Sequence, residues 1–257
     1  MKTTALLHFL QAAILLCLLS VGPGFAATFS VNPVADAFVT TGPSGNLSTN
    51  NYGGAGALSI AAPGLAQGEF QSVLQFNLSG AKNSFDSQFG AGLWSIQSVT
   101  LQLTAIAPNN GIFNSSAAGQ FNLSWMQNDS WTEGSGNPMM PGNTGITYAT
   151  LGNFLSGADE SLGTFSFNGA TSGNFTYSLN LTPSFSADIL SGGIVGLRPF
   201  AADNSVSILF DSRSFGTASA RPLLTISVVP EPGTLSLGII GLSLFAWRRP
   251  LRRNPHE

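Results

Sequence analysis

Charged residues, histidine and cysteine are all scarce in this sequence of 257 residues. Only 8% of the residues are Asp, Glu, Lys or Arg, against about 25% in an average soluble domain. Cys17 and His8 stand near the N-terminus, and His256 is the second-last residue. The stretch between therefore excludes a Ser-His-Asp triad, a cysteine nucleophile, a zinc site of ordinary ligands and a disulfide framework. Carboxylate chemistry, oxygen-ligand metal sites and plain binding remain.

Residues 1–26 have the pattern of a secretory signal peptide. Lys2 gives a positive start, residues 5–19 are almost wholly apolar, and Pro23 ends the run. Small residues then occupy the positions that a signal peptidase reads before its cleavage point. We therefore expect cleavage after Ala26 and export of the chain that follows. An uncleaved anchor helix is the alternative.

The C-terminal segment, residues 229–257, has three parts in a fixed order. An apolar run over 234–247 would span about 21 Å as a helix, short for a hydrocarbon core of about 30 Å, and so suits a transient anchor. The arginines after it hold this end in the cytoplasm by the positive-inside bias. In chain order the polar elements are Val229, Pro230, Glu231 and Pro232 before the run, and Arg248, Arg249, Arg252 and Arg253 after it.

This ordered tail resembles the PEP-CTERM sorting signal of Gram-negative bacteria that make exopolysaccharide. The resemblance rests on the motif over 229–232, the helix and the arginine cluster. It implies processing near Pro230–Pro232 by an exosortase, a transpeptidase-like membrane protease, after a transient stay in the inner membrane. A plain membrane-anchored tail is the alternative. The expected location is the cell surface or the extracellular matrix of a Gram-negative bacterium.

Residues 27–228 show apolar and polar residues alternating with a period of two. Such windows are typical of antiparallel strands with one buried face, and Gly-, Pro- and Asn-rich turns separate them. The pattern predicts about ten strands in one all-β domain, a two-sheet antiparallel sandwich of jelly-roll type. We expect the signal helix and the short transmembrane helix to flank it, and inside it only a helical turn at 184–190. The clearest windows are 70–78, 99–105, 121–125, 175–181, 206–210 and 224–228.

The charge balance of residues 27–228 limits the partners of this domain. Four cations and ten acids give a net charge of −6. Nucleic acid is therefore a poor partner, and a polyanionic sugar would be repelled over most of the surface. The outward positions of the predicted strands are mainly Asn, Gln, Ser and Thr, which suits a hydrated polymer matrix.

Four groups of short motifs span nearly the whole of this domain. They are Ala35–Val39 with Asn51–Gly54 and Leu58–Ile60, Phe70–Leu78, Trp131–Gly134 with Gly145–Tyr148, and Phe210–Arg213 with Arg221–Ile226. In this order they resemble the DNRLRE-type domain, a secreted β-sandwich related to a family of carbohydrate-binding modules. The family commonly has Arg where Gln71 and Gln75 stand, and Trp where Tyr148 stands. The resemblance therefore implies a fold more firmly than a ligand.

Four residues are candidates for ligand binding: Trp131, Glu133, Tyr148 and Arg213. A Trp beside a carboxylate can stack on a sugar ring while the carboxylate accepts hydrogen bonds from sugar hydroxyls. The alternative is that Trp131 fills the core beside a loop and Glu133 caps or bridges. For Arg213 the alternative is an ion pair with a carboxylate such as Asp211 or Glu133.

Asp36 and Asp211 are candidates for a structural calcium site, the one cofactor the sequence suggests. They stand near the ends of the first and last strands and would lie close together if those strands pair; calcium takes six to eight oxygen ligands. No catalytic residue is predicted. A glycosidase needs two acids about 5 to 9.5 Å apart, and nothing in the sequence marks a pair such as Asp129 with Glu133 as lying in a cleft.

Together these features predict a non-enzymatic exported protein that binds or organises exopolysaccharide in a biofilm or floc. Its expected partners are an exosortase, a polysaccharide and, transiently, the inner membrane. Two alternatives stay open. One is a polysaccharide-active enzyme that uses carboxylates only, and the other is a structural surface protein that binds other proteins.

Overall fold

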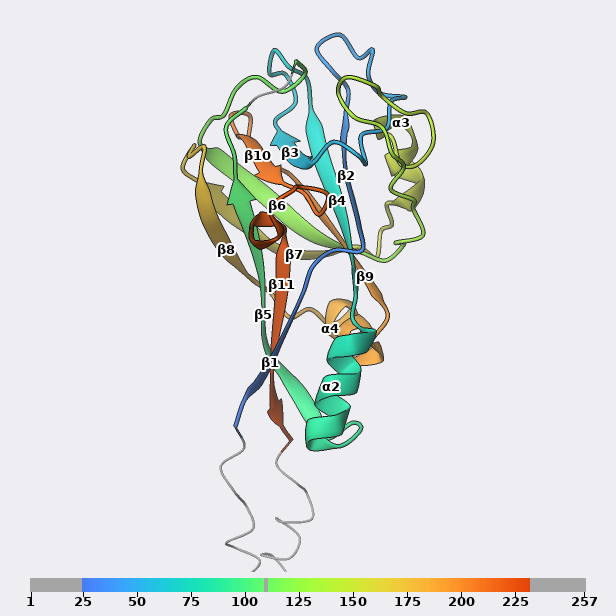
Figure 1. The fold of residues 1–257 in the computed structure, drawn as a ribbon, viewed down its shortest axis with the longest axis vertical. Coiled ribbons are helices and arrows are strands. Elements are labelled where there is room, and N and C mark those ends of the chain that lie inside the picture. The colour runs from blue at the N-terminus through green and yellow to red at the C-terminus, as the bar shows by residue number, and fades with distance from the viewer. Residues whose placement is uncertain (1–24, 109–110, 232–257) are drawn as a thin grey trace, which may run out of the picture.

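The computed structural model describes residues 25–108 and 111–231, which form an antiparallel β-structure with few helices (Figure 1). The all-β prediction is therefore confirmed. Nearly all of the predicted signal peptide, the predicted helix at 234–247 and the arginine cluster lie outside the described residues. Among the residues that are described, no helix is long and apolar enough to cross a membrane.

Eleven strands and a few short helices make up the described chain. The strands are β1 Ala27–Val31, β2 Ala35–Thr40, β3 Ala57–Ala61, β4 Phe70–Asn77, β5 Trp94–Ala105, β6 Gly119–Met126, β7 Glu160–Phe167, β8 Gly173–Leu179, β9 Ile194–Ala201, β10 Ser207–Asp211 and β11 Leu223–Pro230. The helices are α2 Ser79–Phe89, α3 Tyr148–Leu151 and α4 Pro183–Ser191, with 3-10 turns at Gly152–Phe154 and Ala218–Ala220.

Hydrogen bonds join the strands in the order β1-β11-β5-β10-β3-β4-β9-β6-β7, while β2 also pairs with β4 and β8 with β5. Two of the strand pairings in this path, which we call narrow joints, consist of a single residue pair. Phe210 pairs with Ala105 between β10 and β5, and Ala61 pairs with Phe70 between β3 and β4. The sheet thus has two broad groups of strands, one around β5 and β11 and the other around β4, β9 and β6, and the paired strands β10 and β3 lie between them, joined to each group by one of these single residue pairs.

Side chains from both groups of strands meet in one large hydrophobic core. On β5 the buried residues Val99, Leu101 and Leu103 alternate with less buried polar ones, as the sequence predicts. Leu123 of β6 and Leu197 of β9 belong to the same core. The period-two pattern therefore identifies the core face of these strands.

Strand β4 departs from the expectation of a single buried face. Phe76 packs in the large core, whereas Val73 points to the other face and joins a second cluster with Val39, Trp131 and Ile146. The expectation is wrong here because the chain between β6 and β7 folds back over the outer face of β2 and β4. Apolar residues in that long connection supply the cover.

Helix α4 confirms the helical turn expected at 184–190, whereas α2 was not predicted. Ala81 and Phe85 are buried on one side of α2, and Phe89 packs against the same core. These three residues are spaced four apart, which is the available signal for an amphipathic helix. The many Ser, Asn, Asp and Gln residues between them obscure it.

Strand β11 reaches into the segment predicted to be the sorting motif. Val229 and Pro230 pair with β5, and the N–H of Glu231 donates to the carbonyl of Leu93 at 2.9 Å. The predicted domain boundary after residue 228 therefore falls inside the last strand. Because β1 pairs with β11, the two ends of the described chain lie side by side at the lower end of the molecule (Figure 1).

Candidate functional site

Glu133 and Arg213, two of the predicted ligand-binding residues, bind each other. Arg213 Nε donates to Glu133 Oε1 at 2.6 Å, and Arg213 Nη2 pairs with Oε2 of the same carboxylate. Glu133 Oε1 also accepts the backbone N–H of Asp36 at 3.1 Å, and Asp36 Oδ2 accepts the backbone N–H of Arg213 at 2.7 Å. We call these three residues the acid–arginine cluster. It ties β2 to the connection after β6 and to the segment after β10, so the alternative of a bridging Glu133 paired with Arg213 is confirmed.

Trp131 and Tyr148 are also engaged inside the protein. The Trp131 side chain is only 3% exposed and belongs to the second hydrophobic cluster, so the alternative of a core residue beside a loop is confirmed. The half-buried Tyr148 donates its hydroxyl to Glu69 Oε2 at 2.6 Å. Burial and this hydrogen bond raise the pKa of Tyr148 to about 12. The four predicted ligand-binding residues therefore serve internal contacts.

Gln71 and Gln75 also form internal hydrogen bonds. They stand where the resembled family commonly has Arg. Gln71 Nε2 donates to Glu69 Oε1 at 2.6 Å. Gln75 Nε2 donates to the carbonyl oxygens of Asp129 and Trp131 at 2.5 and 3.0 Å. Gln75 thereby fixes the start of the long connection that covers β4.

The motif over 51–54 has a structural role in the same region. Asn51 is fully buried; its amide donates to the carbonyls of Glu133 and Ile146, and its Oδ1 accepts the N–H groups of Gly53 and Gly136. A Cβ on Gly53 would lie 2.1 Å from the Glu133 carbonyl oxygen. Only glycine allows the two backbones to approach so closely.

Asp36 and Asp211, the residues proposed for calcium, are each only 1% exposed. One carboxyl oxygen of each has no hydrogen-bond partner. Burial raises the pKa of Asp36 to about 7 and that of Asp211 to about 6. The described part of the chain contains no group of three or more His, Cys, Asp or Glu side chains that could hold a metal ion. The calcium site stays a prediction without support from these residues.

The acids considered for catalysis have separate partners. Glu133 lies in the acid–arginine cluster, whereas the neighbour of Asp129 is Asp188 of α4. Burial, together with the negative charge of Asp188, raises the pKa of Asp129. Burial also raises the pKa of Asp188, although Trp125 Nε1 donates to that carboxylate at 3.0 Å. The carboxylate whose charge acts on Asp129 is therefore Asp188, not Glu133.

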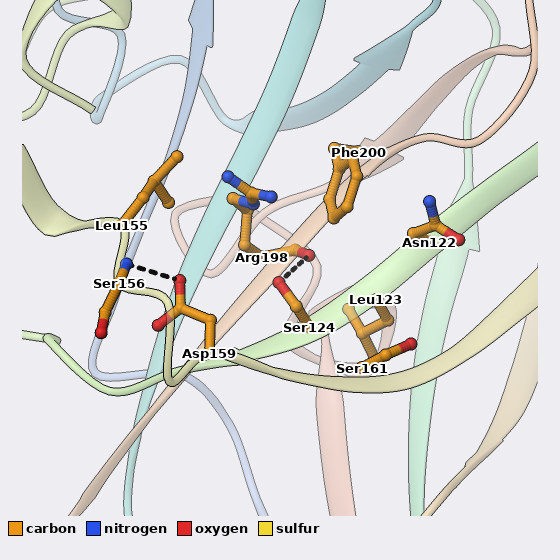
Figure 2. Close-up of a pocket in the computed structure, with 9 residues that line it drawn as sticks. All are labelled: Asn122, Leu123, Ser124, Leu155, Ser156, Asp159, Ser161, Arg198 and Phe200. Atoms are coloured by element: carbon orange, nitrogen blue, oxygen red, sulfur yellow. Dashed lines mark hydrogen bonds between the residues drawn. The ribbon is translucent and has the colours of Figure 1, made fainter. Parts of the chain in front are cut away.

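A pocket of about 470 Å³ opens on the outer face of β6, β7 and β9 (Figure 2). Leu123 of β6 and Leu197 of β9 point into the core, so alternating residues on these strands point to the opposite face. The loop before β7 forms one side of the pocket (Figure 2). The residues of this face that line the pocket are Asn122, Ser124, Leu155, Ser156, Asp159, Ser161, Arg198 and Phe200, and Leu123 of β6 also borders it although its side chain belongs to the core.

Arg198 and Phe200 lie side by side in this pocket (Figure 2). The guanidinium carbon of Arg198 is 4.1 Å from the centre of the Phe200 ring, within cation–π range. Arg198 Nε is buried and has no hydrogen-bond partner. Burial lowers the pKa of Arg198, while the charges of Asp159 and Glu69 act in the opposite direction. The pocket thus offers a cation, part of an aromatic ring, a carboxylate, an amide and several hydroxyls.

The sequence did not mark Arg198 and Phe200 as site residues. Their signal is weak: a cation and an aromatic residue two positions apart, on the strand face opposite the core residues Val195 and Leu197. The signal gains meaning only when β6 and the loop before β7 lie beside β9. That neighbourhood is a property of the tertiary fold.

Comparison with protein-family models gives no match to this chain, and comparison with curated proteins gives none either. The PEP-CTERM and DNRLRE resemblances therefore remain predictions from the motifs. The fold and the pocket together define an antiparallel β protein with a polar recess on one sheet face.

Proposed function

We propose that this chain is a non-enzymatic, exported surface or matrix protein that binds or organises exopolysaccharide. The pocket beside Arg198 and Phe200 is the observation that carries the proposal. Sugars present hydroxyls and flat C–H faces, which amides, hydroxyls and aromatic rings recognise in proteins. Asn122, Ser124 and Ser161 supply such polar groups in the lining.

We further propose that the fold is a two-sheet sandwich of jelly-roll type. Two features support this: narrow single-pair joints between the two groups of strands, and one core that both groups share. In such a fold the two sheets pack by their inner faces, so the parts of the outer faces that no loop covers are free for ligands, and the pocket lies on the outer face of β6, β7 and β9.

The export route follows from the two ends of the sequence. An exosortase would process the protein near Pro230–Pro232 after the helix predicted at 234–247 has held it in the inner membrane. Deleting residues 230–232 should trap full-length protein in the inner membrane, measured by fractionation and immunoblotting. Ser227→Ala, which lies in the same strand but outside the motif over 229–232, is the control. Unchanged processing of the deletion variant would refute the sorting proposal.

A binding assay tests the main function. The full-length protein in detergent is run by affinity electrophoresis through gels that contain neutral or acidic polysaccharides, the producing cell's own polymer included. Retardation by at least one polymer supports the proposal. Absence of retardation in every gel would contradict it and favour a structural protein that binds other proteins.

A carboxylate-dependent enzyme is the second candidate, because burial and the charge of Asp188 raise the pKa of Asp129, and burial raises the pKa of Asp188. A general acid needs a raised pKa of this kind. Steady release of reducing sugar ends, lost in Asp129→Asn and Asp188→Asn, would favour the enzyme. Glu133→Gln serves as the control for a carboxylate in an internal ion pair.

A further inference from the structure

We propose that the Arg198 pocket binds a sugar residue that carries one carboxylate within an otherwise largely neutral polysaccharide. This inference rests on the proposed function and specifies the ligand class of its site. It follows from the unused hydrogen-bonding capacity of Arg198, the shape of the guanidinium group and the charges around the pocket.

Arg198 has unused hydrogen-bonding capacity. Lys82 and Arg213 lie in ion pairs, and Arg221 donates its Nε–H to a backbone carbonyl at 3.0 Å. Of the cations that the structure describes, Arg198 is the one whose guanidinium has no hydrogen bond or ion pair, and its Nε is buried. A buried donor without an acceptor is unfavourable, and a ligand that supplies the acceptor removes this cost.

The geometry of Arg198 favours a carboxylate as that acceptor. The guanidinium fork matches the two oxygens of a carboxylate, and charge-assisted hydrogen bonds are about twice as strong as neutral ones. Contact with the Phe200 ring restricts the side chain in advance, so less conformational entropy is lost on binding. Asn122 and Ser161 in the same lining provide partners for the hydroxyls of the same or the next sugar.

The charges around the pocket oppose a densely charged polymer. Asp159 is part of the lining, and the charge of Glu69 also reaches Arg198. Residues 27–228 carry a net charge of −6. A chain with a carboxylate on every sugar would therefore bring most of its charges against a negative surface, whereas a single carboxylate can pair with Arg198.

Titration of the full-length protein in detergent with glucuronate tests the pocket. Glucose serves as the neutral probe of the same ring size. We expect glucuronate to shift the NMR signal of the Arg198 Nε–H group, which is assigned by its loss in Arg198→Gln. Glucose should bind at least tenfold more weakly, because it lacks the charge-assisted hydrogen bonds.

Variants separate the guanidinium from charge in general. Arg198→Gln should weaken glucuronate binding at least tenfold, and Arg198→Lys should restore part of it. Lys82→Gln changes the net charge equally but lies in α2, away from the pocket lining, and should leave binding unchanged. Thermal unfolding of each variant shows that the fold is retained.

Carboxymethyl-dextrans test the charge density. A lightly substituted polymer should bind more tightly than unmodified dextran and than a heavily substituted one. Equal binding of glucuronate and glucose, an unshifted Arg198 signal, or affinity that rises steadily with substitution would overturn the inference. Equal retardation of Arg198→Gln and the unchanged protein by a lightly substituted carboxymethyl-dextran would overturn it while leaving the proposed function intact.

Discussion

Replacing Glu133 by Gln should destabilise the protein through the acid–arginine cluster. The Glu133 carboxylate accepts three hydrogen bonds, two from the Arg213 side chain and one from the Asp36 backbone N–H. A glutamine keeps the size of the side chain but loses the charge. Its amide keeps one acceptor oxygen but replaces the other with an N–H donor group, so one of the two Arg213 donors loses its acceptor.

The exposure of the pair determines the expected magnitude. Breaking a fully buried ion pair costs about 3–5 kcal/mol, whereas exposed pairs contribute about 0–1 kcal/mol. The Glu133 side chain is 15% exposed and that of Arg213 is 36% exposed, so water replaces part of what Arg213 loses. We therefore expect a decrease of about 2 kcal/mol in the free energy of unfolding.

Urea unfolding of the full-length protein, followed by tryptophan fluorescence at neutral pH, measures this decrease. Lys82→Gln breaks the pair with Asp86, which is an i,i+4 contact within helix α2. Pairs of this kind are worth only about 0.3–0.5 kcal/mol, so this variant should have a much smaller effect. The double variant Glu133→Gln with Arg213→Gln gives the coupling energy of the pair. If Glu133→Gln lowers stability no more than Lys82→Gln does, the cluster does not hold the three segments together as the contacts indicate.

Two further predictions concern the same region. Burial is the main reason why the pKa of Asp36 is about 7 in the folded protein, against 3.8 for the ordinary side chain. The contribution of the protonated Asp36 carboxyl to the free energy of unfolding is therefore complete below pH 3.8 and is lost as the pH rises through about 7. Relative to Asp36→Asn, the unchanged protein should lose stability between about pH 4 and 7 by up to about 1.4 kcal/mol per pH unit. If the free energy of unfolding, measured with urea at each pH, changes with pH equally in the two proteins, the prediction is wrong. Gly53→Ala should lower the melting temperature by many degrees, because its Cβ would lie 2.1 Å from the Glu133 carbonyl oxygen. Gly157→Ala is the control, because its Cβ would meet nothing within 4 Å. Equal melting temperatures of the two variants would show that the contact at Gly53 can relax.

Much of the fold could be predicted from local patterns, and the exceptions have physical causes. The alternation at 99–105 marks one buried face of β5 because only one side of that strand meets the core. The same kind of pattern at 70–78 was misleading because the connection after β6 covers the second face of β4. A polar residue such as Gln75 looks exposed in the sequence, yet it hydrogen-bonds that connection.

The candidate site was less predictable than the fold. Trp131, Glu133 and Arg213 were singled out by residue type, and their alternatives as internal residues are the ones the structure bears out. Residue type and spacing do not predict a site at Arg198 and Phe200, because a single cation and a single aromatic residue on a strand are common. Their importance depends on neighbours that are distant in the sequence.

The sequence by itself determined the all-β class, the main core faces and the scarcity of His and Cys chemistry between the two ends. These follow from residue type and from the period of the strand, which are local properties. Only the tertiary structure decided that Glu133 meets Arg213 and that, among the described residues, the Arg198 guanidinium contacts the Phe200 ring but makes no hydrogen bond or ion pair. Which side chains contact one another depends on which strands and loops become neighbours in the fold. Antiparallel sheets of this kind bring together segments that are far apart in the chain.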